Sequence, residues 1–275
     1  MHASSATKAL EELLSRPEGT WSPAEGALAI ARLGRPGLAP EPYLRRLDEL
    51  GRKARERVGR ARHPRFVAGA VASVLLDREG FRVTGTVDAP EHCFLDRVLD
   101  GAPATPTLLA LVFIEVARRC GFRFDGVGMP GRFLLRRDDG ERPFLFDPLD
   151  RFQPVDLARC AEIVHQATGG RVSFREGHLR PITASQLLAR IAANLKAVYW
   201  RAGDYERALT AVQMILTIRP GDPREIRDRG RALFLLGRFG EAIESFETYL
   251  AHNPRGEDAD VVRMLLQEAR AGLSP

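Results

Sequence analysis

A repeat with a spacing of 34 residues near the C-terminal end constrains the fold more than any other feature of this chain. Tyr205–Leu209 corresponds in residue type to Phe239–Ile243, and three identical residues recur at the same spacing. They are Gly203 with Gly237, Ala208 with Ala242, and Pro220 with Pro254. Small residues allow two helices to approach closely, and a proline ends a helix. The spacing therefore predicts two stacked helical hairpins, which form a short solenoid.

The period and the residue types of this segment resemble tetratricopeptide repeats. The solenoid is predicted to begin near Thr183 and to finish with a capping helix over about 257–271, because an open end would expose apolar surface. The resemblance implies a protein or peptide partner. It makes Tyr199, Arg229 and Leu233 the candidate binding residues.

The residues before the solenoid change from helical to strand patterning. Up to about residue 88 the signals are helical, such as the cap Ser22 followed by a proline in the first turn. The helix predicted over Pro106–Cys120 is apolar on nearly all sides, so it is expected to be buried. The segments that follow are predicted strands at 122–129, 133–136 and 144–146 and a helix at 156–168.

This order of elements predicts an α+β domain of residues 1–180 followed by an all-α solenoid of residues 181–275. The first domain is expected to have a helical subdomain over about 1–88. A core helix with a small antiparallel sheet is expected over about 89–180. The second domain is expected to hold two repeats and the capping helix.

Four segments of the first domain resemble the bacterial SirB-type family, in which a transglutaminase-like domain precedes tetratricopeptide repeats. They are Phe94–Pro103, Leu108–Gly121, Gly126–Leu135 and Leu145–Pro148, in this order and spacing. The resemblance implies a papain-like arrangement of three residues. In such enzymes a Cys at the start of a buried helix is the nucleophile, a His on the next strand is its base, and an Asp on a further strand orients the His.

Two of the three catalytic positions of that arrangement carry other residues in this chain. Thr105 or Pro106 stands where the nucleophile is expected, and Arg132 follows Pro-Gly where the family commonly has His. An arginine stays protonated at physiological pH and cannot act as a general base. Asp147 alone matches its position, and an ion pair between Arg132 and Asp147 is expected. We therefore predict a non-catalytic relative of transglutaminases, a scaffold or regulator that binds a protein partner through its cleft and repeats.

Two alternative functions rest on other residues. Cys93, preceded by His92, or Thr105 could serve a residual hydrolase or acyltransferase, although a small buried cysteine at a helix start is the more common case. Residues 41–65 form a predicted helix and loop with nine basic and four acidic residues, which suggests a nucleic-acid surface. A solvated helix face explains the same pattern, because no aromatic row or known motif accompanies it.

The remaining patterns argue against cofactor, metal and membrane functions. The three cysteines Cys93, Cys120 and Cys160 are spread out without a CxxC pair, and no glycine-rich phosphate loop is present. We expect no cofactor and no metal. The start of the chain lacks the apolar stretch of a secretory signal, and the longest apolar runs are too short to span a bilayer. A cytoplasmic protein without membrane segments is expected.

Overall fold

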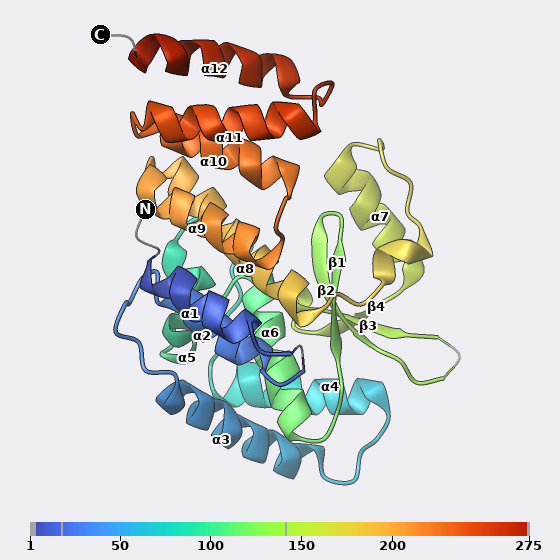
Figure 1. Cartoon of the computed structure of the whole chain (residues 1–275). Helices are drawn as coiled ribbons and strands as arrows, with labels where there is room; N and C mark the ends of the chain where they lie inside the picture. The colour runs from blue at the N-terminus through green and yellow to red at the C-terminus, as the bar shows by residue number, and fades with distance from the viewer. Residues whose placement is uncertain (1–3, 18, 141, 274–275) are drawn as a thin grey trace.

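The structure is a computed structural model that describes residues 4–17, 19–140 and 142–273 of the chain (Figure 1). The helices of the first two thirds are α1 (Ser5–Leu14), α2 (Pro23–Ala31), α3 (Glu41–Val58), α4 (Pro64–Ala72), α5 (Leu95–Leu99), α6 (Pro106–Arg119) and α7 (Leu157–Thr168). The π-helix η1 (Ser73–Arg78) continues α4, and three short 3₁₀ segments are η2 (Pro90–Cys93), η3 (Pro148–Asp150) and η4 (Glu176–Leu179).

The four strands form one antiparallel sheet in the order β1-β2-β3-β4. They are β1 (Asp125–Met129), β2 (Arg132–Arg137), β3 (Phe144–Asp147) and β4 (Gln153–Val155). Side chains alternate between the two faces of such a sheet, and each face here packs on different helices. Phe133, Leu135 and Phe146 join the main core with α6, whereas Leu134 and Leu145 join a smaller core with α7.

Helix α6 is the centre of the main core, as its apolar sequence predicted. Leu108–Phe113 are fully buried, and Phe113 lies against the rings of Phe124 and Phe152 at 5.1 and 4.6 Å. Helix α3 packs along it, because Gly51 leaves room for the side chain of Arg119. An α+β domain with a small antiparallel sheet is thus confirmed, and β4 is a strand that the sequence did not indicate.

The solenoid consists of two helical hairpins and a final helix, as the repeat predicted. Its helices are α8 (Ala184–Arg201), α9 (Tyr205–Ile218), α10 (Pro223–Leu235), α11 (Phe239–His252) and α12 (Ala259–Leu273). Gly230 shows why small residues recur: a Cβ there would lie 2.5 Å from a ring atom of Phe246 on α11. The close contact between α10 and α11 therefore requires a residue without a side chain.

The beginning of the chain covers the first hairpin of the solenoid. Helix α1 packs against α9, and α2 packs against α8, so these two N-terminal helices act as an additional hairpin layer (Figure 1). Gly26 of α2 lies directly against Leu188 of α8. The main core therefore runs without interruption from α1 and α2 through α6 into α8 and α9.

This packing bears on the predicted domain organisation. The predicted boundary near Arg180 falls between η4 and α8, but the hydrophobic core does not stop there. The helices of residues 1–88 also divide between two neighbours: α1 and α2 lie on the solenoid, while α3 and α4 lie on α6. No helix within the described residues is both long and apolar enough to cross a bilayer.

Candidate functional site

The start of α6, where the sequence places the nucleophile position, is a buried helix cap. The Leu108 N–H donates to the Thr105 hydroxyl over 3.3 Å, and Pro106 occupies the first helical turn. The N–H of Thr105 donates to the carbonyl of His92 at 2.9 Å. Thr105 is 1% exposed. Its hydroxyl therefore satisfies an otherwise unpaired helix N–H and has little contact with solvent.

Arg132 and Asp147 are brought together as an ion pair. The Arg132 Nε lies 3.6 Å from Asp147 Oδ2, which is close enough for ion pairing but longer than a normal hydrogen bond. The N–H of Leu149 donates to Asp147 Oδ1 at 2.8 Å. Burial raises the pKa of Asp147, while this hydrogen bond and the Arg132 charge oppose the rise. The aspartate therefore both caps the turn into η3 and neutralises an arginine.

The pair lies on the face of the sheet that α7 covers. Arg132 is directly opposite Met129 in the β1–β2 register, and Met129 belongs to the small core with α7. Asp147 follows Phe146 on β3, so its side chain points away from the face of Phe146 and toward the face that carries Arg132. It lies close enough to Cys160 of α7 to raise the pKa of that thiol further.

Helix α6 packs on the opposite face of the sheet, which is the face that carries Phe133. Among the described residues, no hydrogen bond or ion pair joins Thr105 to Arg132 or Asp147. The structure thus assembles two of the three predicted site positions and leaves the third apart.

None of the three thiols is placed as a nucleophile. Cys93 is 1% exposed, and burial raises its pKa to about 12. Burial raises the pKa values of Cys120 and Cys160 to about 11 each. A cysteine attacks as its thiolate, and almost none is present at neutral pH under these conditions. His92 lies beside Asp88, with its Nδ1 3.3 Å from a carboxylate oxygen.

The candidate binding residues of the repeats require a correction. Tyr199 and Leu233 are 5% and 1% exposed, because both fill the space between solenoid helices, so neither can contact a partner in this structure. Arg229 is half-buried and donates to the Ser245 hydroxyl at 3.0 Å. An exposed apolar side chain of α10 is instead Leu235, which is 48% exposed.

Trp200 and Arg231 lie at the junction of α8 and α10 and were missed by the sequence reasoning. The Arg231 guanidinium lies 5.3 Å from the centre of the Trp200 ring. Arg231 is exposed and Trp200 is half-buried, so the pair is within reach of a partner. The signal was present in the sequence: Arg231 precedes the buried Leu233 by two residues, and positions two apart do not share a helix face.

An unusual lysine ties the two repeats together. Lys196 lies 34 residues before Gly230, where a small residue would match the repeat. Its ammonium group pairs with Glu225 at 2.7 Å and with Asp228 at 2.8 Å, both on α10. Burial raises the pKa of Glu225, and the Lys196 hydrogen bond opposes that rise. Lys196 of α8 thus has structural partners on α10, the first helix of the second repeat.

Part of the charge on the basic helix α3 is neutralised within the molecule. Glu79 at the end of η1 pairs with Arg46 at 2.7 Å and with Lys53 at 2.8 Å. Asp48 pairs with Arg119 of α6 at 2.6 Å. These ion pairs connect α3 to η1 and α6. Part of the charge that suggested a nucleic-acid surface is therefore paired within the molecule.

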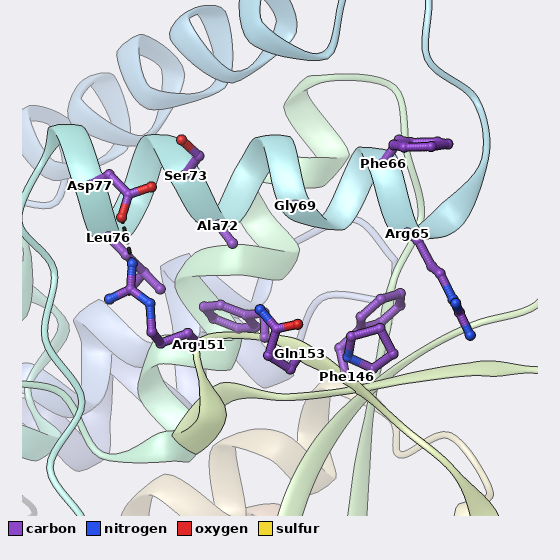
Figure 2. A pocket seen from close by; sticks show the side chains of 12 residues that line it. Arg65, Phe66, Gly69, Ala72, Ser73, Leu76, Asp77, Phe146, Arg151 and Gln153 are labelled. Atoms are coloured by element: carbon purple, nitrogen blue, oxygen red, sulfur yellow. Dashed lines mark hydrogen bonds and ion pairs between the residues drawn. The ribbon is translucent and has the colours of Figure 1, made fainter.

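Two adjoining cavities form a groove between α4 and the β4 edge of the sheet, called here the α4–β4 groove. The first, of about 320 Å³, is lined by one side of α4 and η1 and by residues 151–154 (Figure 2). The Asp77–Arg151 ion pair closes one end at 2.5 Å, and Arg65 stands at the other (Figure 2). The second, of about 990 Å³, shares Arg65 and Pro154 with the first and extends to Glu176 and Leu179.

Comparison with known proteins identifies the family. The family model described as the transglutaminase-like superfamily matches residues 41–193, which is more than half of the chain, and a tetratricopeptide repeat model matches residues 195–267. The chain belongs to the transglutaminase-like superfamily. Its expected architecture, a transglutaminase-like domain followed by tetratricopeptide repeats, is thereby confirmed. No solved structure matches the chain.

Curated relatives of this transglutaminase-like protein are UPF0162 proteins of bacteria. One from Xylella fastidiosa is 33% identical over 177 residues, and the match covers 63% of each chain. One from Pseudomonas aeruginosa is 32% identical over 202 residues, which covers 71% of this chain and 72% of the relative. One from Vibrio cholerae is 28% identical over 182 residues, or 62% of this chain and 64% of the relative.

The residues expected at the catalytic positions have other uses in this structure. The hydroxyl of Thr105 caps a helix, and Arg132 is a cation paired with Asp147. Within the described part of the chain, no three His, Cys, Asp or Glu side chains gather as a metal ion would require. The chemical features of this arrangement are the Arg132–Asp147 ion pair on one face of the sheet and the α4–β4 groove at its edge.

Proposed function

We propose that this transglutaminase-like protein is catalytically silent and acts as a scaffold or regulator that binds a protein partner. The observation that carries the proposal is the placement of Arg132. It stands where the family resemblance leads us to expect the general base, is ion-paired with Asp147, and lies on the α7 face of the sheet rather than on the face that packs against α6. A permanent cation at that position supplies no base, and an acyl-transfer reaction of this type depends on one.

The burial of the cysteines supports the same proposal. An alternative enzyme using Cys93 would need a thiolate exposed to its substrate. Cys93 is buried at a short 3₁₀ segment that packs on α8, and its pKa is raised to about 12. Thr105 offers no better nucleophile, because its hydroxyl accepts a helix hydrogen bond and no histidine side chain bonds to it among the described residues.

The repeats supply a surface suited to a protein partner. Trp200, Arg231 and Leu235 lie on α8 and α10 and are at least partly accessible. Tryptophan and arginine are the residues that contribute most often to protein interfaces. The α8–α10 surface is therefore the part of the solenoid through which we expect the partner to bind.

The test captures partners from the source organism with the intact chain, using reversible crosslinking and quantitative mass spectrometry. Substitutions are preferred to truncations, because a chain ending near Arg180 would lose helices that share the main core. Leu235→Arg places a charge on the α8–α10 surface. Val261→Arg is the matched control, since Val261 is 49% exposed on α12.

We expect the wild-type protein and Val261→Arg to retain the same defined partner and Leu235→Arg to lose it. Capture by none of the three would contradict the scaffold proposal. Turnover of an acyl substrate by the purified chain, abolished by Cys93→Ala, would contradict the catalytic silence and favour the residual hydrolase.

A further inference from the structure

The backbone on both sides of the α4–β4 groove is unusual. On one side, α4 continues as the π-helix η1, which supplies Ser73, Leu76 and Asp77 to the lining. On the other side, Arg151 and Phe152 are consecutive non-glycine residues with φ of 50° and 58°, in the left-handed region. Non-glycine residues in this region are strained, and such strain and π-helical turns concentrate at functional sites. Two independent irregularities thus meet at one groove.

The lining combines an apolar floor with arginines at the rim. Phe144, Leu145, Pro154 and Leu179 contribute to the floor of the larger cavity, and Leu157 beside them is 39% exposed. The rim carries Arg65 and Arg142, both exposed, and neither has an ion-pair partner among the described residues. Arg65 lies over the Phe144 ring at 5.8 Å, so its guanidinium is held beside the floor.

Strand addition at the edge of the sheet does not explain this groove. The edge strand β4 has three residues, and its middle residue is Pro154, which lacks an N–H. Such a strand cannot present a continuous row of backbone donors and acceptors to an added strand. Recognition in the groove must therefore come from side chains, through apolar contacts with the floor and charged contacts with the rim.

We propose that the α4–β4 groove binds a peptide segment of the partner protein that carries acidic and apolar side chains. Carboxylates of the segment pair with Arg65 and Arg142, and its apolar side chains lie on the floor formed by Phe144, Pro154 and Leu157. Planar guanidinium groups bind carboxylates through two parallel hydrogen bonds, which gives both affinity and orientation. This inference rests on the proposed scaffold function, because it names a site and a chemistry for its partner.

A peptide fits this groove better than a nucleic acid. Asp156 and Glu176 also line the larger cavity, and their charges would repel a continuous row of phosphates. A peptide can place its acidic side chains at the two arginines and its apolar or basic side chains elsewhere.

The experiment selects a random library of short peptides, displayed on phage, against the intact protein. Individual selected peptides are then measured by fluorescence anisotropy with wild type, Arg65→Glu and Arg142→Glu. Arg52→Glu is the matched control, because Arg52 is an exposed arginine of α3 outside the groove. Thermal unfolding of all four proteins checks that the fold is unchanged.

We expect the selected peptides to be enriched in Asp and Glu together with apolar residues. The Arg65→Glu and Arg142→Glu variants should each weaken binding by about tenfold or more, whereas Arg52→Glu should bind like wild type. No enrichment, neutral or basic sequences, or equal binding by all variants would overturn the proposal. So would an oligothymidine that binds wild type and competes with the peptides.

The outcomes separate this inference from the scaffold proposal. If the groove selects no peptide while crosslinking still captures a partner that Leu235→Arg loses, the groove inference fails and the scaffold proposal stands. If no partner is captured and acyl turnover is found, the scaffold proposal fails whatever the peptide result.

Discussion

At the scale of single residues, the defining feature is a cation where the family resemblance leads us to expect a catalytic base. Arg132 and Asp147 form an ion pair in which each charge offsets the other. Asp147 is 6% exposed, so without Arg132 its carboxylate would be a buried charge with no opposite charge beside it. The His–Asp pair of an active enzyme has a different use, because a histidine can lose its proton at neutral pH. The pair found here holds the sheet together electrostatically.

Replacing one partner of this pair should destabilise the fold. Arg132→Met leaves Asp147 without its cation, and we expect the free energy of unfolding at pH 7 to fall by about 1–3 kcal/mol. Adding Asp147→Asn, which keeps an acceptor for the Leu149 N–H, should recover part of the loss. Urea unfolding of both single variants and the double variant gives the coupling energy. Strict additivity would contradict the ion pair.

A second residue-scale prediction concerns Asp96 of α5. Asp96 is 1% exposed, and neither carboxylate oxygen has a hydrogen-bond partner, although Arg97 lies within ion-pair distance at 3.9 Å. Burial raises the pKa of Asp96 above the ordinary value of an aspartate. The folded state therefore binds the proton more tightly than the unfolded state, and the associated stability is lost as the pH rises through the folded pKa.

The Asp96→Asn variant has no carboxyl group at this position, so it does not lose stability through ionisation of residue 96 as the pH rises. We expect the variant to be more stable than wild type at pH 7 by about 1–3 kcal/mol, with the difference shrinking toward zero below the unfolded pKa. Urea unfolding at several pH values measures it. A difference that grows as the pH falls would show that the pKa of Asp96 is lowered instead.

The contact between Arg132 and Asp147 could be foreseen from the sequence, because the two positions match neighbouring strands of a known arrangement. The face on which they lie could not. It depends on the register that pairs Arg132 with Met129, and a shift of one residue would move every side chain of a strand to the other face. Likewise, the burial of Tyr199 depends on packing between helices that no local pattern reveals.

At the scale of elements, periodic segments were predictable and irregular ones were not. The repeats and α6 have long apolar patterns, and the structure has helices there. The helical signals expected up to about residue 88 did not reveal the π-helix η1, which follows α4 after Ala72. Strand β4 escaped prediction because three residues with a central proline carry no alternating pattern.

Two glycines in the second repeat should respond oppositely to alanine. Gly230 of α10 lies against Phe246 and Ser245 of α11, so Gly230→Ala should destabilise the protein by about 1–3 kcal/mol. Gly240 of α11 has no heavy atom near its would-be Cβ, so Gly240→Ala should stabilise the helix by about 0.5–1 kcal/mol. Chemical unfolding distinguishes them. Equal effects at both sites would contradict the close helix contact.

At the scale of the whole molecule, the two ends of the chain form one structure. Helices α1 and α2 complete the solenoid at its beginning, and the main core includes side chains from α1, α6 and α9. The sequence predicted the solenoid and its final helix, but not which segment covers its first hairpin. That contact includes Gly26 and Leu188, which are 162 positions apart, and it follows from shape and burial across the fold.

Shortened chains test this continuity. A chain ending at Arg180 loses α8 and α9, whose buried residues belong to the main core, so it should show no cooperative thermal transition. A chain ending at Pro220 keeps both helices and loses mainly the second core cluster, so it should still unfold cooperatively, with lower stability. Circular dichroism and tryptophan fluorescence follow both. Cooperative unfolding of the chain ending at Arg180 would contradict the shared core.

The most direct test of the central claim, a transglutaminase-like fold without a catalytic thiol, is the rate of cysteine alkylation in the folded protein at neutral pH. Iodoacetamide, with peptide mass spectrometry, reports each of the three sites separately. Because burial raises the pKa values of Cys93, Cys120 and Cys160 to about 12, 11 and 11, we expect all three to react far more slowly than free glutathione until the protein is unfolded. A cysteine that reacts faster than glutathione in the folded protein would contradict the account.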